Sequence, residues 1–134
     1  MKAEAFLDTG IFIAWLVGND RYHARAEELL AKPPRSLATS LAVVSETYSW
    51  FLHRFGEQEA RLFRLALREL PGLTLFPVDL PHHAAVERKL ERLRGQKLTY
   101  VDASSLVFIA QHRIKVVWGT DVHLGIEGAS VLPA

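Results

Sequence analysis

The sequence predicts an α/β domain with a mainly parallel central sheet flanked by helices. Short apolar runs alternate along the chain with longer segments of helical spacing, a pattern typical of parallel sheets. The chain has 134 residues, of which 49% are hydrophobic, so one core can form without disulfides or metal staples. It has no cysteine, which excludes a disulfide framework and a thiolate zinc site. We therefore expect residues 1–134 to form a single domain.

Apolar runs that stop at turn residues predict the strands of the first half, and amphipathic segments bounded by Gly or Pro predict its helices. Asp8 ends the first strand, Pro33 follows the second helix and Gly56 follows the third. Ser40 is a favourable N-cap residue for that third helix. In order, we expect a strand at 3–7, helices at 11–17 and 21–32, a strand at 36–39 and a helix at 41–55.

The second half follows the same rules and ends in two strands. Pro71 stops one helix, and Asp79 can cap the next. The helix expected at 100–112 is apolar nearly all round, which places it inside the domain. In order, we expect a helix at 57–70, a strand at 73–78, helices at 80–94 and 100–112, and strands at 114–118 and 129–132.

Four acids stand among apolar or small neighbours, where a charge needs a partner. Asp8 and Asp121 follow strands, and ligands of open parallel sheets bind outside the carboxyl ends of strands. Glu46 lies in a helix whose first turns are otherwise apolar, and Asp102 lies in the first turn of the central helix. We treat these four as candidate site residues.

A structural role remains open for each acid considered alone. Asp8 and Asp121 fit turn or N-cap positions, and Glu46 fits an exposed helix position. Thr99 and Asp102 have the spacing of a capping box, in which both side chains bond to the first turn of the helix.

Convergence of the four acids would have a specific chemical meaning. Carboxylates a few ångströms apart raise one another's pKa and cannot all ionise unpaired. A hard divalent cation resolves this conflict, and ligation by oxygen alone favours Mg²⁺ or Mn²⁺ over Zn²⁺. Such a cation can activate water, orient a phosphate and stabilise a leaving oxygen. The implied chemistry is phosphodiester hydrolysis.

These acidic motifs resemble, in order and spacing, those of the PIN domain, a family of metal-dependent ribonucleases. The most similar subgroup is that of the VapC-type toxins of prokaryotic toxin–antitoxin pairs. The resemblance covers essentially the whole chain and rests on four motifs: Phe6-Leu7-Asp8-Thr9, Ser45-Glu46, Leu98-Thr99-Tyr100-Val101-Asp102-Ala103 and Gly119-Thr120-Asp121. Three positions depart from the family pattern: Thr9 stands where many relatives carry Ser or Asn, Gly119 is smaller than expected, and Leu124 replaces an aromatic residue.

The resemblance implies a metal-dependent endoribonuclease that hydrolyses RNA phosphodiester bonds as the toxin of a type II pair. Asp8, Glu46, Asp102 and Asp121 would be its catalytic and metal-site residues. Thr9 and Thr120 would support them. It further implies a Mg²⁺ or Mn²⁺ cofactor, a cognate antitoxin and a homodimer, for which the helix at 41–55 is either an interface or plain core.

Alternative functions remain open from the sequence. One is a PIN-like RNA-binding module without catalysis, and another is a housekeeping PIN nuclease without a toxin role. A dehalogenase-type phosphatase would need an acid where Gly10 stands, and the acid and lysine pattern of a receiver domain is absent. The basic stripe Arg61, Arg64 and Arg68 and the basic stretch at 88–97 fit either phosphate contacts or solvated helix faces.

The cellular setting is expected to be the cytoplasm. The first residues lack the long apolar segment of a signal peptide, and no run approaches the length of a membrane span. The net charge of +1 indicates no particular partner, and we expect no association with membranes.

Overall fold

The computed structural model describes residues 2–134, which contain a five-stranded sheet in which all paired strands are parallel. The strand order is β3-β2-β1-β4-β5. The predicted α/β fold class is thus confirmed, and the sheet is entirely rather than mainly parallel within these residues. The strands are β1 (Ala5–Leu7), β2 (Leu37–Ser40), β3 (Leu73–Phe76), β4 (Val116–Gly119) and β5 (Ser130–Pro133).

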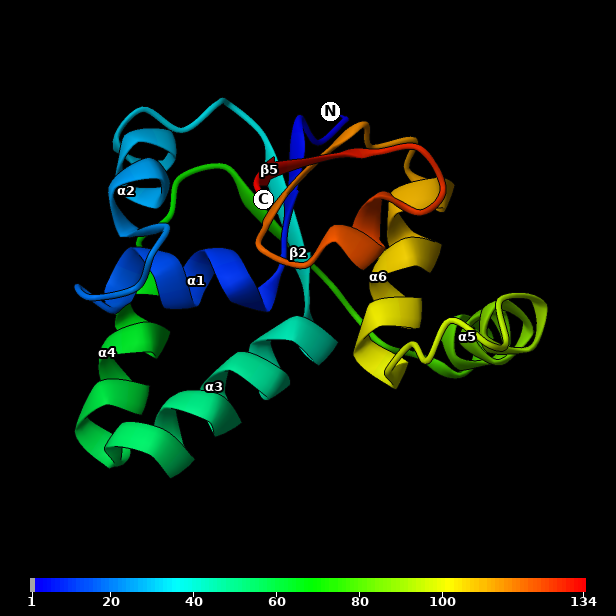
Figure 1. Cartoon of the computed structure of the whole chain (residues 1–134), viewed down its shortest axis with the longest axis horizontal. Helices are drawn as coiled ribbons and strands as arrows, with labels where there is room; N and C mark the ends of the chain where they lie inside the picture. Colours follow the sequence, from blue (N-terminus) through cyan, green and yellow to red (C-terminus); the bar gives the residue numbers. More distant parts are fainter. Residues whose placement is uncertain (1) are drawn as a thin grey trace.

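Helices cover both sides of this sheet (Figure 1). Figure 1 shows α1, α2 and α4 on one side and α5 and α6 on the other. Helix α3 begins where β2 ends, and it contacts both α1 and α6, so it joins the two sides at the carboxyl edge of the sheet. The helices are α1 (Thr9–Leu16), α2 (His23–Ala31), α3 (Leu41–Phe55), α4 (Glu57–Arg68), α5 (Leu80–Arg92) and α6 (Tyr100–Gln111).

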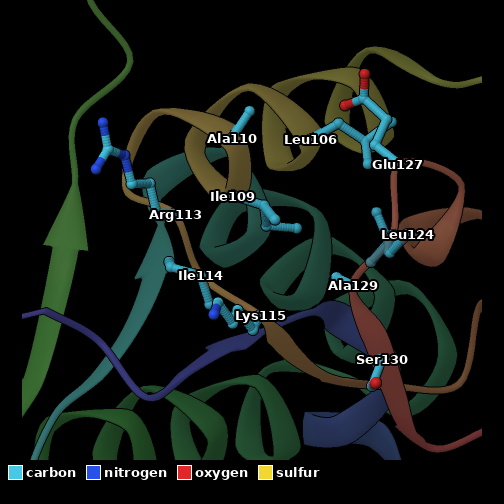
Figure 2. Close-up of a pocket in the computed structure, with 11 residues that line it drawn as sticks. Leu106, Ile109, Ala110, Arg113, Ile114, Lys115, Leu124, Glu127, Ala129 and Ser130 are labelled. Carbon is cyan, nitrogen blue, oxygen red and sulfur yellow. The ribbon is translucent and has the colours of Figure 1, made fainter.

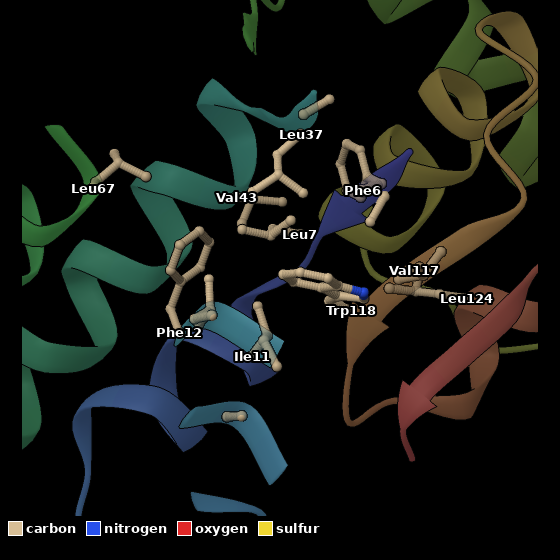
Figure 3. Packing of buried hydrophobic residues seen from close by; sticks show 14 of the residues in the cluster. Phe6, Leu7, Ile11, Phe12, Leu37, Val43, Leu67, Val117, Trp118 and Leu124 are labelled. Atoms are coloured by element: carbon tan, nitrogen blue, oxygen red, sulfur yellow. The ribbon is translucent and has the colours of Figure 1, made fainter. Parts of the chain in front are cut away.

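The centre of the core is the short strand β1. Phe6 and Leu7 are fully buried, and side chains from the neighbouring strands and from α1, α3 and α4 meet around them (Figure 3). The ring of Phe12 on α1 meets Phe63 on α4 edge to face, at 5.4 Å between ring centroids. Phe51 on α3 stacks on the same Phe63 ring at 5.7 Å. Aromatic packing therefore fixes α1, α3 and α4 as one unit.

Helix α6 is buried as its composition predicts. Every residue from Ala103 to Ile109 is buried, including the polar Ser104, whose hydroxyl lies 2.7 Å from His82 Nε2 of α5. That hydrogen bond couples α5 to α6 and satisfies Ser104 inside the protein. Within residues 2–134, neither α6 nor any other helix is long and apolar enough to cross a membrane.

Strand β4 begins two residues later than the sequence predicts, because a C-cap follows α6. Arg113 has a left-handed φ of +53°, the amide N of Ile114 bonds to the Ile109 carbonyl O at 2.9 Å, and the amide N of Arg113 bonds to the Ala110 carbonyl O at 3.3 Å. This is a Schellman C-cap built on Arg rather than Gly. The cap includes Ile114, where the strand was expected to start, so β4 begins at Val116. A short 3₁₀ helix (Val122–Gly125) that was not predicted follows β4.

Candidate active site

Asp8 lies at the end of β1 and is 5% exposed. Its backbone is extended at the N-cap position of α1, and its N–H donates to the Trp118 carbonyl oxygen of β4 at 2.9 Å. Its side chain makes no capping hydrogen bond to α1, although the sequence also allowed a capping role. The backbone thus anchors Asp8 to the sheet while its carboxylate faces the other acids of the site.

Burial raises the pKa of the Asp8 carboxyl from 3.8 to about 7. The loss of water is the main cause, the Thr9 amide opposes it, and the negative charges of Glu46, Asp102 and Asp121 raise the pKa further. The other three acids selected from the sequence therefore lie close enough to Asp8 for their charges to act on it. Only Asp8 among the four acids is buried, and the other three are partly exposed.

Thr9 connects Asp8 to Glu46. The Thr9 hydroxyl donates to Glu46 Oε1 at 2.6 Å, which ties the first residue of α1 to the middle of α3. Buried Thr47 lies behind this bond, with its Oγ1 atom 3.1 Å from Thr9 Oγ1 and 2.7 Å from the Val43 carbonyl oxygen. Because the Thr47 hydroxyl has one proton, the shorter contact to Val43 is its main hydrogen bond. The Thr9 hydroxyl thus fixes the Glu46 carboxylate, and Thr47 lies directly behind it.

Asp102 forms the capping box that its spacing predicts. Its Oδ2 atom accepts from the Thr99 amide at 3.1 Å, and the Asp102 amide donates to Thr99 Oγ1 at 3.1 Å. The capping alternative is thus confirmed, but it does not exclude a second role. The capping box uses Oδ2, which leaves the second carboxylate oxygen of Asp102 available for another contact. The charge of Asp102 also acts on Asp8.

Asp121 follows β4 and is held by its own loop. Its Oδ1 atom accepts from the His123 amide at 2.9 Å and lies 3.1 Å from His123 Nδ1. The turn role that the sequence allowed is therefore real, and it again coexists with a place near Asp8. His123 orients the Asp121 carboxylate rather than being an unattached loop residue.

Two glycines, Gly10 and Gly119, make the close approach of these elements possible. A Cβ at Gly10 would lie 2.2 Å from Thr120 Oγ1 and 2.9 Å from the Thr120 amide nitrogen, so any side chain there would separate α1 from the β4 loop. A Cβ at Gly119 would lie 3.2 Å from Asp8 Cβ. The small residue that departs from the family pattern thus leaves room for the buried Asp8.

The donor set around Asp8 consists of carboxylate oxygen atoms, and His123 is the one basic side chain that pairs with any of these acids in the described residues, so the excess of negative charge fits a hard divalent cation. In the part of the chain that the structure describes, no three His, Asp or Glu side chains are close enough together to hold a metal ion among them. Mg²⁺ commonly keeps several waters and takes only one or two carboxylates directly. The arrangement therefore fits a cation held partly through water.

The largest of the described pockets does not coincide with these acids. It has a volume of about 800 Å³ and lies between the end of α6 and the loop before β5 (Figure 2). Leu106, Ile109, Ile114 and Leu124 give it an apolar floor, and Glu127 lies at its rim. Leu124, another departure from the family pattern, is fully buried there and belongs to the core.

The two basic stretches differ in availability. Arg61, Arg64 and Arg68 are exposed along α4. Lys89 Nζ of α5 lies 2.9 Å from Glu127 Oε1, and Arg92 also pairs with Glu127. The ion pairs of Lys89 and Arg92 therefore link α5 to the loop before β5, a contact that the sequence analysis did not predict.

The fold is an all-parallel α/β sheet, and Asp8 and Asp121 follow the carboxyl ends of β1 and β4. This arrangement defines a class of protein with an acidic site at that edge of the sheet. The PIN domain family matches residues 5–124 of the chain. The chain belongs to the PIN domain family. The family resemblance predicted from the four motifs is thus confirmed.

Solved structures of toxins share this fold. The VapC20 toxin of Mycobacterium tuberculosis, which cleaves the sarcin–ricin loop, matches with a TM-score of 0.84 and 23% identity over 93% of this chain and 95% of that chain. FitAcB from Neisseria gonorrhoeae matches with a TM-score of 0.69 and 17% identity over 95% of both chains. A toxin–antitoxin complex from Klebsiella pneumoniae matches with a TM-score of 0.66 and 21% identity over 96% of this chain and 95% of that chain. No curated protein sequence matches the chain.

The raised pKa of Asp8 predicts how stability depends on pH in EDTA. The folded protein holds a proton that the unfolded chain releases above pH 3.8, so the free energy of unfolding falls as pH rises toward 7 and levels off above it. The Asp8 contribution falls by about 2–3 kcal/mol between pH 5 and pH 8. Urea unfolding of the native chain and of Asp8→Asn at both pH values measures it. Equal pH dependence in the two proteins would contradict the shift.

Proposed function

We propose that the chain is a VapC-type, metal-dependent endoribonuclease, the toxin of a type II toxin–antitoxin pair. The observation that carries the proposal is the burial of Asp8 against the charges of Glu46, Asp102 and Asp121 within a PIN domain. A protein retains such an unfavourable charge cluster where a cation or a reaction requires it. The proposed substrate is RNA, and the proposed setting is the cytoplasm.

The proposed cofactor is Mg²⁺ or Mn²⁺, held by Asp8, Glu46, Asp102 and Asp121, directly or through water. When bound, the cation supplies Lewis-acid activation of water and charge stabilisation at the phosphate. Oxygen-only ligands select these hard cations over Zn²⁺.

The residues of the chain itself orient this chemistry. The buried Asp8 would hold the cation as an ionised carboxylate, because a neighbouring positive charge would offset both the burial and the negative charges that raise its pKa. Thr9 holds Glu46, Thr99 holds Asp102 and His123 holds Asp121, each by a hydrogen bond to the carboxylate. Three acids are thereby fixed before substrate binds, so little reorganisation accompanies the reaction.

The partner that we propose is a cognate antitoxin. VapC20 and the Klebsiella complex belong to toxin or toxin–antitoxin systems, and they share the fold of this chain over at least 93% of its length. The negative charges near Asp8 are a natural target for a cationic side chain of a protein inhibitor. A housekeeping PIN nuclease and a PIN-like RNA-binding module remain the alternatives that the experiments below separate.

We also propose a homodimer. The predicted interface helix α3 divides between two roles, because Phe51 is buried in the core whereas Leu41 is 46% exposed. Leu41, Val78 and Tyr100 line one shallow pocket, and Leu80, two residues after Val78, is 83% exposed. An exposed cluster of large apolar side chains is typical of an interaction surface.

The cleavage experiment tests the catalytic proposal. Purified protein is incubated with structured RNA in Mn²⁺, Mg²⁺ or EDTA, beside Asp8→Asn, Asp102→Asn and Asp79→Asn. We expect metal-dependent cutting that falls at least about a hundredfold in the first two variants. Asp79→Asn is the matched control, because Asp79 caps α5 and Asn caps equally well.

Cutting that persists in EDTA, or that survives unchanged in folded Asp102→Asn, would contradict the proposed site. Metal binding without any cutting of RNA would favour the RNA-binding module. Cutting with no antitoxin encoded beside the gene would favour the housekeeping nuclease.

The dimer proposal predicts that Leu80→Glu is monomeric. Leu80 is the first residue of α5, where an acid suits the helix dipole, so the substitution should leave the fold intact. Sedimentation of the native chain and of this variant measures the change. A native chain that is monomeric at high concentration would refute the dimer, and a variant that still dimerises would place the interface elsewhere.

A further inference from the structure

A groove adjoins the acids on one face of helix α3. It has a volume of about 730 Å³ and begins at the hydrogen-bonded pair of Thr9 and Glu46. Its α3 residues are related to one another by spacings of three and four positions, so they share one face of the helix. The lining residues are Thr9, Glu46, Ser49, Trp50, His53 and Arg54.

The chemistry of the groove changes along its length. Glu46 supplies a carboxylate at the end that adjoins Asp8, whereas His53 and Arg54 supply nitrogen donors at the far end. Glu46 and Arg54 are eight positions apart, which corresponds to about 12 Å along a helix. Glu46 is a proposed ligand of the cation, and Arg54 carries a guanidinium at the other end of the groove. Two positive groups at this separation suit a polymer with negative charges at regular intervals, such as the phosphates of a nucleic acid.

Trp50 supplies an aromatic surface between these ends. The indole is half-buried and makes edge contacts with Phe51 at 5.1 Å and Phe55 at 5.7 Å between ring centroids. The Arg54 guanidinium carbon lies 5.4 Å from the indole centroid, in a cation–π arrangement. Trp50 is therefore held in place by its neighbours, and both the indole and the guanidinium are surfaces on which nucleobases stack.

We propose that this groove binds one nucleotide of a single-stranded RNA next to the cleaved bond, with its base on the Trp50–Arg54 pair and its phosphate near Arg54 and His53. The inference rests on the proposed ribonuclease function, whose substrate-binding region it extends. A single strand is favoured over a duplex, because a base must be unstacked from its neighbours to reach an aromatic side chain.

The direct test is RNA binding in EDTA, in an Asp8→Asn parent that cannot cut. The probes are a fluorescein-labelled single-stranded RNA of twelve mixed nucleotides and the same strand annealed to its complement. We expect Trp50→Leu to weaken single-strand binding about tenfold, since stacking contributes strongly per base. We expect Arg54→Gln to weaken single-strand binding. It should also reduce the slope of log K against log salt concentration by about 0.7 in magnitude, the value for one phosphate contact on a single strand.

The control is Arg21→Gln. The Arg21 guanidinium carbon also lies 5.0 Å from an aromatic centroid, that of Tyr22, but Arg21 does not line the groove. It should leave RNA binding and its salt dependence unchanged. Arg54 is exposed, so Arg54→Gln tests the groove even if Trp50→Leu lowers stability.

Parental RNA affinity in both folded groove variants would overturn the inference. An effect of equal size in Arg21→Gln, or a preference for the duplex, would overturn it as well. Groove variants that keep parental RNA binding but lose dimerisation or antitoxin binding would also overturn it, because the groove would then be a protein interface. Because these measurements need no catalysis, weaker binding by the variants would support the groove even if the native chain failed to cut RNA. Metal-dependent cutting with unchanged binding would retain the proposed function and reject the groove.

Discussion

The carboxylate of Asp8 is removed from water and faces three other negative charges, and the arrangement of the rest of the site depends on this conflict. Desolvation alone disfavours its ionised form, and the neighbouring acids add to the effect, so its pKa reaches about 7. The surrounding acids are held by hydrogen bonds from the Thr9 hydroxyl and from the Thr99 and His123 amides, and the one basic side chain that pairs with any of them in the described residues is His123, at 3.1 Å from Asp121 Oδ1. The charge that remains uncompensated is the feature that a divalent cation would resolve.

The fold creates this conflict by bringing four separate segments to one edge of the sheet. Parallel pairing of β1 with β2 and β4 directs the ends of these strands to the same edge, where Asp8 and Asp121 follow β1 and β4. Helix α3 carries Glu46 across that edge and contacts both helical layers. The absence of side chains at Gly10 and Gly119 allows the loop after β4 to approach. Packing of the core thus fixes an electrostatic feature that is unfavourable by itself.

The alternation of apolar runs and helices was sufficient to predict the parallel fold, and the apolar setting of the four acids was sufficient to select them. Their structural roles were predicted too, since Asp102 caps α6 and Asp121 holds a turn while both act on Asp8. The roles of Thr47, Gly10 and Gly119 could not be predicted, although Gly119 stood out as a departure from the family pattern, because these roles lie in contacts between distant segments. The Schellman cap at Arg113 was missed because that left-handed position usually carries Gly.

Calorimetric titration of the native chain with Mn²⁺, in buffers of different ionisation enthalpy, tests most directly whether a cation resolves the charge conflict at Asp8. With a pKa of about 7, metal binding should release ~0.8 proton at pH 6.5 and almost none at pH 8.5, and affinity should rise between these pH values. Asp8→Asn should bind Mn²⁺ more weakly and release no proton. Absence of Mn²⁺ binding, or binding by the native chain with no proton release at pH 6.5, would contradict the account.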